Sequence, residues 1–466
     1  MKIRNLLLGS LAVAGLSTTG AYAADLGVLT SLDVCDSLGL SGLTISSDTN
    51  CLQITGEVKY KFTWGDYRPV GLSVATAAGS VDFIGGDGLN DWQSRFDAWI
   101  KFVATADSDF GPAKAVLKLK EVNHRRHDAE VPVGSGDTLG IGSSDTGGVV
   151  LDEAYVSIGD STVIMAGKKG SIMNKGDDEP LNFLTLFNSE AVDAGVSWGP
   201  SVRLPDGGHV IQVTSDLGNG LSVSAGLEAL NQLNTDGDPG DEGDAGTAVG
   251  VIAYKGEGLS AHATFAAAGV LDGTVEDWGV HAGFAGTFDA FKVVLAGAFG
   301  HNSNPSTPAD GPDNVNPVTD YWNVLASASA TFDMFTIAAS FEAVDEDGVT
   351  DFGAGGSVGF AVSDGVSLNL GGRWYHDESA DDDSYQIAAQ VVAAVTETIT
   401  VTGEVGYVNT QNSLSESEDL FYGSAKLAWA PGGGYTSSIK GTVTSPSGED
   451  VDMGYKLETE FKKTFE

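Results

Sequence analysis

The stretch Cys51–Trp64, CLQITGEVKYKFTW, alternates between two kinds of side chain along its whole length. Because successive side chains of a β-strand point to opposite sides, it predicts a strand with one apolar face and one charged face. The apolar face holds Leu52, Ile54, Gly56, Val58, Tyr60, Phe62 and Trp64, and the charged face holds Gln53, Thr55, Glu57, Lys59, Lys61 and Thr63. A half-buried strand of a soluble protein would show the same pattern, so the fold depends on whether the pattern recurs.

The alternation recurs down the chain, usually with an aromatic residue at one end. It is found in Trp92–Phe102, Ala113–Lys120, Val366–Trp374 and Thr398–Tyr407. Tryptophans at or near the ends of the predicted strands (Trp64, Trp92, Trp278, Trp322, Trp374 and Trp429) are typical of the aromatic girdle of a membrane barrel.

Composition narrows the fold class further. Gly occurs 63 times in 466 residues, about twice its usual share, which favours turns and small wall residues over helices. The net charge of −40 argues against binding of nucleic acid, whose phosphates require a basic surface. Beyond the N-terminus no apolar run reaches about 18 residues, which excludes a helical membrane protein but not a membrane barrel.

Short turns and long polar segments divide the predicted strands into pairs. Nine turns have hairpin length, and all but one of them contain Gly, Asp or Pro. They are Asp107–Pro112, Gly159–Ser161, Asp216–Gly220, Lys255–Gly258, Phe288–Ala290, Phe332–Met334, Ser363–Gly365, Thr396–Thr398 and Pro431–Gly434. Longer segments lie between them, for example Asn231–Gly246, Asn302–Thr319, His376–Asp383 and Asn409–Glu418. Nine hairpins with a first and a last strand predict an all-β, antiparallel transmembrane barrel of 20 strands, with short periplasmic turns and long outer loops.

The N-terminal region predicts export. Residues 1–23 have the basic start, the apolar centre and the Ala21-Tyr22-Ala23 site of a signal peptide. Residues 24–50 are then a periplasmic segment, and residues 51–466 form the transmembrane barrel. In an oxidising compartment the only two cysteines, Cys35 and Cys51, are expected to form a disulfide, with two free thiols as the alternative.

The segment from Lys168 to His209 departs from the strand pattern. Five large apolar residues, Leu181, Phe183, Leu184, Leu186 and Phe187, follow the acids Asp177, Asp178 and Glu179. A solvated loop gains nothing from such residues, so we expect the segment to fold back into the barrel against the inner wall. The alternative is a short amphipathic helix on the outer rim.

Two motifs resemble a known family. The blocks Val34-Cys35-Asp36 and Thr49–Val58, followed later by Asp152–Val156 leading to Gly167-Lys168, resemble the porins of alphaproteobacterial outer membranes. The resemblance implies a homotrimeric channel, usually of 16 strands, whose third loop narrows the pore. The last strand ends at Phe465, which resembles the signal that the barrel assembly machinery recognises, although Glu466 follows it.

Other chemistry finds little support in the sequence. His124 and His127 lie beside Arg125 and Arg126, which would repel a metal ion, so we interpret them as part of a solvated loop. The acidic stretch Asp236–Asp244 lacks the ligand order of a calcium loop and is better explained as a surface loop that weakly gathers divalent ions near lipopolysaccharide. No catalytic motif is found, so we expect no enzyme, no cofactor and no metal site.

The sequence therefore predicts a passive, water-filled channel for small hydrophilic solutes and ions in the bacterial outer membrane. The alternative is a plugged structural or adhesive barrel. Seven bases are expected to line one arc of the pore: Lys59, Lys61, Arg95, Lys101, Lys114, Lys118 and Lys120. The loop acids Asp177, Asp178 and Glu179 are expected to face them and create a transverse field, unless the lysines only solvate the lumen.

Overall fold

The computed structural model describes most of the chain. The described residues are 33–76, 79–86, 90–127, 148–173, 176, 179–184, 198, 202, 204–231, 245–273, 275, 277–302, 319–378, 381–411, 417–447 and 452–466. The expected signal peptide, Asp177, Asp178 and the acidic stretch Asp236–Asp244 lie outside them. Within these residues, no helix is both long enough and apolar enough to cross a membrane.

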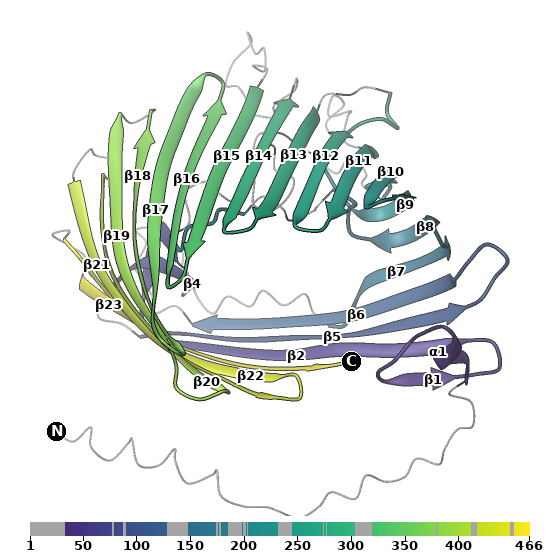
Figure 1. The fold of residues 1–466 in the computed structure, drawn as a ribbon, viewed down its shortest axis with the longest axis horizontal. Helices are drawn as coiled ribbons and strands as arrows, with labels where there is room; N and C mark the ends of the chain where they lie inside the picture. Colours follow the sequence, from purple (N-terminus) through teal and green to yellow (C-terminus); the bar gives the residue numbers. More distant parts are fainter. Residues whose placement is uncertain are drawn as a thin grey trace, which may run out of the picture.

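The described strands close into an antiparallel barrel of 20 strands, which are β2 and β5 through β23 (Figure 1). Their bounds are β2 (Cys51–Asp66), β5 (Asp91–Ala106), β6 (Ala113–His127), β7 (Val150–Gly159), β8 (Thr162–Lys169), β9 (Gly208–Gly218), β10 (Leu221–Glu228), β11 (Thr247–Gly256), β12 (Leu259–Ala267), β13 (Asp277–Phe288), β14 (Phe291–Asn302), β15 (Thr319–Phe332), β16 (Phe335–Glu346), β17 (Val349–Ser363), β18 (Val366–Asp377), β19 (Asp382–Ala394), β20 (Ile399–Gln411), β21 (Ser417–Gly432), β22 (Tyr435–Pro446) and β23 (Asp452–Phe465). The barrel closes where β2 pairs with β5 on one side and with β23 on the other. The 20 strands counted from the turns are confirmed, and the 16 implied by the resemblance are not found.

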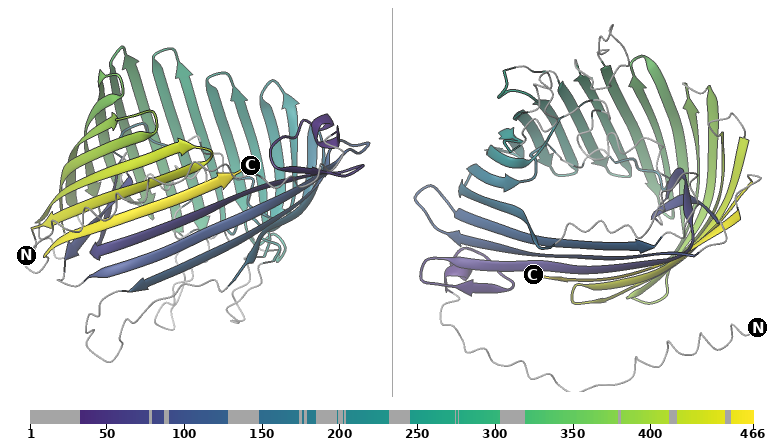
Figure 2. Two further views of the ribbon diagram at one scale, coloured as in Figure 1. Left: turned by 90° about the horizontal axis from the view of Figure 1, so that it is seen from below. Right: turned by 180° about the vertical axis from the view of Figure 1, so that it is seen from behind.

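All nine predicted turns connect neighbouring strands, and in Figure 2 the short turns gather at one rim of the barrel, called the turn rim below. Several of them need a left-handed residue, which Asp tolerates better than most other side chains. Asp289 and Asp333 have φ values of 54° and 51° in two-residue turns. One tight turn, Asp347-Gly348, lies instead at the opposite rim, which carries the long connections and is called the loop rim.

Four short elements lie outside the barrel ring. The helix α1 (Asp33–Ser37) and the strand β1 (Thr44–Ser46) lie beside the start of β2, where Cys35 and Cys51 form the expected disulfide. The hairpin β3 (Arg68–Thr76) and β4 (Gly79–Gly86) interrupts the first long connection, and β4 pairs with the start of β23.

The two faces of the barrel wall differ as the alternation predicts. On β2 the side chains of Val58, Tyr60 and Trp64 are exposed on the outside, although they are apolar. Trp64 lies directly across from Trp92 of β5, which is also exposed, so two tryptophans share one end of the outer face. Such an exposed apolar face is typical of a barrel wall that contacts lipid or another membrane protein. The opposite face of the same strands therefore lines the barrel interior.

Candidate functional site in the barrel interior

All seven predicted bases lie on three neighbouring strands, and the strand register puts them on one face of the sheet. Lys59 and Lys61 belong to β2, Arg95 and Lys101 to β5, and Lys114, Lys118 and Lys120 to β6. Residues directly opposite each other in a sheet lie on the same face. Lys61 is opposite Arg95, and Lys101 is opposite Lys118, so the bases form adjoining rows.

The inner wall also contains acids that sequence reasoning missed. Asp97 contacts both Arg95, at 3.0 Å, and Lys59, at 3.9 Å. Glu458 of β23 contacts Lys61 at 3.0 Å and Lys456 at 3.7 Å. These acids lie on the same strand face as the bases. The alternation along β5 and β23 could therefore have identified them from the sequence.

Two more acids pair with the bases farther along the same wall. Lys101 lies 2.9 Å from Glu153, and Lys118 lies 2.7 Å from Asp152 and 3.9 Å from Glu153, both on β7. Lys118 also lies over the Trp99 ring, 5.2 Å from its centre. We call the seven bases and these four acids, Asp97, Asp152, Glu153 and Glu458, the charged wall.

The charged wall presents its cations to the lumen at the β2 and β5 strands. The side chains of Arg95 and Lys61 are 50% and 43% exposed, whereas those of Asp97 and Glu458 are 16% and 15% exposed. The carboxylates therefore lie closer to the strand backbone than the cationic groups, which project beyond them.

The connection between β8 and β9 packs against the other side of the interior. The backbone N–H of Leu181 donates to Ser327 Oγ of β15 at 2.9 Å, and that of Phe183 donates to Ser357 Oγ of β17 at 3.3 Å. Leu184 is fully buried against Ala388 and Tyr422. The latter two residues lie on the inward faces of β19 and β21, because their neighbours Ile387 and Phe421 are exposed outside.

A second contact region of this connection lies against β11 to β16. Met173, Trp198 and Val202 are buried in one cluster with inward-facing residues of those strands, among them Val249 and Tyr321. Gly300 of β14 makes the close approach possible, since a Cβ there would lie 2.6 Å from the Trp198 Cβ. The described part of the connection thus lies inside the barrel, across from the charged wall.

A buried carboxylate holds both ends of the same connection. Glu228, at the end of β10, is fully buried and accepts hydrogen bonds from the N–H groups of Ile172, at 3.1 Å, and Gly207, at 2.9 Å. Gln212 Nε2 donates to Glu228 at 2.7 Å and to the Gly170 carbonyl at 3.1 Å. We call Glu228 and Gln212 the foot clamp. Sequence reasoning did not find it.

The foot clamp also affects a neighbouring acid in the connection. Burial raises the pKa of the Asp206 carboxyl, and the nearby Glu228 raises it further.

Of the three predicted loop acids, one lies within the described residues. Glu179 is exposed, whereas Asp177 and Asp178 lie outside the described residues. Whether these acids face the charged wall therefore stays a prediction.

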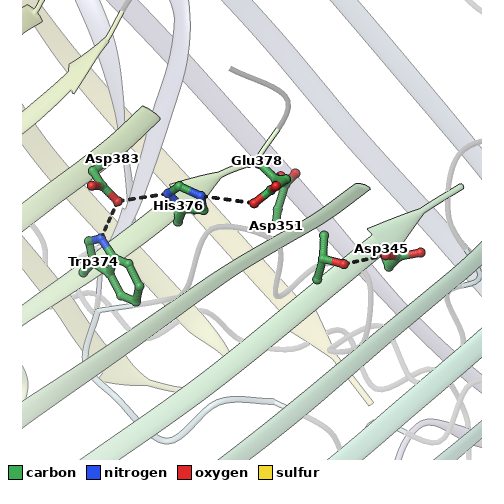
Figure 3. A network of polar contacts seen from close by, with 7 residues as sticks. Asp345, Asp351, Trp374, His376, Glu378 and Asp383 are labelled. Atoms are coloured by element: carbon green, nitrogen blue, oxygen red, sulfur yellow. Dashed lines mark hydrogen bonds and ion pairs between the residues drawn. The ribbon is translucent and has the colours of Figure 1, made fainter. Parts of the chain in front are cut away.

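The loop rim carries a network of polar contacts around His376, shown in Figure 3. His376 lies between Asp383, at 3.2 Å, and Glu378, at 3.4 Å. Trp374 Nε1 donates to the same Asp383 at 2.8 Å, and the Glu378 N–H donates to Asp351 at 3.0 Å. The contacts join β17, β18 and β19 where the last two strands are connected.

In the part of the chain that the structure describes, no three His, Cys, Asp or Glu side chains are grouped to hold a metal ion. His262 and His281 stack in the inner wall of β12 and β13, with ring nitrogens 2.6 Å apart. The interpretation of residues 124–127 as a solvated loop is wrong, because β6 continues to His127.

Comparison with solved structures finds matches of low sequence identity over most of this chain. OccAB4 of Acinetobacter baumannii is 11% identical with a TM-score of 0.42, and the match covers 89% of this chain and 98% of that one. An anion-selective porin from Comamonas acidovorans is 11% identical with a TM-score of 0.34, covering 89% and 100%. The trimer form of OmpT from Vibrio cholerae is 8% identical with a TM-score of 0.36, covering 90% and 100%.

Sequence comparison places the chain in a family. A putative outer membrane protein, y4fJ, of Sinorhizobium fredii is 29% identical over 200 residues, which is 41% of this chain. The match spans half of that relative's length. The family model described as Porin subfamily matches residues 31–426, most of the chain. This bacterial outer-membrane barrel therefore belongs to the Porin subfamily.

Proposed function

We propose that the barrel is a passive, water-filled channel through which small hydrophilic solutes and ions cross the outer membrane. The observation that carries this proposal is the division of the interior. Charged and solvent-exposed side chains line β2, β5, β6, β7 and β23, whereas the β8–β9 connection packs on the inward faces of strands from β11 to β21. The passage then runs between the connection and the charged wall.

The rival function is a plugged structural or adhesive barrel. A plug would favour uncharged packing against the whole inner wall, because burying unpaired charge is costly. The exposed Arg95 and Lys61 side chains favour a wetted wall instead.

Single-channel recording in a planar bilayer tests the proposal. The purified protein should produce discrete current steps in potassium chloride, and uncharged polyethylene glycols of increasing size should stop lowering the conductance above one cutoff size. Protein denatured by heat is the control. A folded barrel that gives no steps would favour the plugged alternative.

We further propose that the channel is a homotrimer with its turn rim in the periplasm. Short turns face the periplasm in bacterial barrels, so α1 and β1, which belong to the predicted periplasmic segment, would lie on that side. Exposed small residues on the outer face, such as Ala326 and Ala328 of β15, would allow close approach of a second barrel. Lipopolysaccharide and the barrel assembly machinery are the other partners that we expect.

A further inference from the structure

The charged wall contains a hollow of about 450 Å³ that the proposed function does not by itself require. It lies where β6, β5, β2 and β23 adjoin, and its lining includes Lys59, Lys61, Arg95, Asp97, Glu458 and Glu460. A hollow of this size accommodates a small polar solute. The arrangement of its charges indicates which kind.

The cations in the hollow outnumber the acids that they contact. Asp97 is shared by Arg95 and Lys59, and Glu458 is shared by Lys61 and Lys456. The group of Arg95, Lys59 and Asp97 therefore keeps one positive charge in excess. Because Arg95 and Lys61 project into the lumen, that excess is available to an anionic group of a solute.

Glu460 supplies the opposite charge at the β23 side of the hollow. It lies directly across from Lys61 in the β2–β23 pairing and is partly exposed. Among the residues that the structure describes, no Lys, Arg or His nitrogen lies within 4.0 Å of its carboxylate. The Glu460 carboxylate can thus bind a cationic group of a solute.

Resting on the proposed channel function, we propose that this hollow is a subsite for zwitterionic amino acids. Arg95 and Lys61 bind the solute's carboxylate, and Glu460 binds its ammonium group. Neighbouring strands lie about 4.8 Å apart, so one small molecule reaches both charges. A simple anion lacks a group for Glu460, and a simple cation meets the projecting bases, so both should bind less tightly.

Three matched probes test the subsite: L-alanine, propionate, which lacks the ammonium group, and ethylammonium, which lacks the carboxylate. Each is added to single channels in a planar bilayer, and the concentration that halves the ion current is measured at low salt. Alanine should block at a concentration about tenfold lower than either analogue, since each ionic contact contributes about that factor.

Two substitutions separate the ends of the subsite. Glu460→Gln should weaken block by alanine about tenfold and leave block by propionate unchanged or stronger. Arg95→Gln should weaken block by both. The matched control is Glu57→Gln, on the same face of β2 but outside the hollow and paired with Lys462 at 3.5 Å, which should change neither. Equal block of Glu460→Gln and the wild type by alanine would overturn the proposal.

A second measurement does not depend on channel activity. Equilibrium dialysis of labelled L-alanine against the folded barrel in detergent should show saturable binding that Glu460→Gln weakens about tenfold. Current steps without alanine binding would reject the subsite and keep the channel. Alanine binding without current steps would keep the subsite and reject the channel.

Discussion

At the scale of single residues, the foot clamp makes a prediction about the β8–β9 connection. In the wild type, both carboxylate oxygens of Glu228 accept hydrogen bonds from N–H groups. In Glu228→Gln the side-chain NH2 would replace one of these oxygens and point at an N–H donor, so a buried donor would lose its hydrogen bond. The cost should be about 1–3 kcal/mol. We expect more frequent transient closures in single-channel records. Glu397→Gln, at an exposed turn, is the control, and closures equal to those of the control would contradict the clamp.

The disulfide makes a second prediction at this scale. Cys35 and Cys51 are separated by 16 residues, and closing a loop of that length should stabilise the N-terminal segment by roughly 3 kcal/mol. Without it, α1 and β1 should be cleaved first under limited proteolysis, while the barrel stays intact. The experiment compares Cys35→Ser/Cys51→Ser with the wild type, and peptide mapping without reductant should recover the wild-type cysteines cross-linked. Equal cleavage rates would contradict the expected anchoring.

Alternation alone predicted which side chains of β2, β5 and β6 share one face of the sheet, because successive residues of a strand point to opposite sides. It did not identify their partners. The Lys61–Glu458 contact joins residues from opposite ends of the chain, and only closure of the barrel brings them together. The foot clamp was missed for a related reason, since Glu228 acts on a connection that enters the interior before β9.

At the scale of elements, Leu184 should anchor the β8–β9 connection to the far wall. Leu184→Ala removes a fully buried side chain that packs against Ala388 and Tyr422. Such a change typically costs 2–5 kcal/mol in a packed core, so the anchored part should detach more often. Trypsin should cleave within residues 170–207 faster in this variant. The matched control is Ile387→Ala, exposed on the outer face of the same wall, and unchanged cleavage of Leu184→Ala would count against the anchoring.

Turn chemistry made the strand order predictable, because each short turn joins antiparallel neighbours and most of these turns place a Gly or Asp in a left-handed conformation. The long connections were less predictable. The β3–β4 hairpin lies inside the first of them, and its short, Gly-rich strands gave no distinct signal. The turn at Asp347-Gly348 is a two-residue hairpin turn, but it lies at the loop rim. The expectation that all short turns lie at one rim therefore does not hold for this turn.

At the scale of the whole molecule, the outer face makes a prediction about assembly. A shallow hollow of about 810 Å³ crosses the outer face of β10 to β15 and includes Gly250 and Gly297. We expect a heat-modifiable, protease-resistant trimer after mild detergent extraction. Gly250→Leu should fold, since no atom lies within 4 Å of an added Cβ, but it should dissociate the trimer by filling the hollow.

The control for assembly is Gly441→Leu on β22, where an added Cβ also meets no atom within 4 Å. Native mass measurement should show a trimer for the wild type and the control, and a monomer for Gly250→Leu. A wild-type monomer in several detergents would contradict trimer formation. A trimeric Gly250→Leu would show that the barrels meet at another face.

The last prediction concerns ion selectivity, which depends on charge close to the passage. The net charge of −40 would enrich cations at the mouth, but salt screens exposed charge beyond about 8 Å at physiological ionic strength. The charged wall should therefore determine the ion selectivity more strongly than the net charge does. Changing Lys59, Lys61 and Lys118 together to Glu leaves Asp97, Glu458 and Asp152 without these cations and reverses three local charges. The reversal potential under a salt gradient should shift toward cation selectivity, whereas Asp177→Lys/Asp178→Lys should shift it toward anions. Lys255→Glu, near the β11–β12 turn, is the control. If neither set of changes moves the reversal potential further than the control does, these residues do not line the constriction.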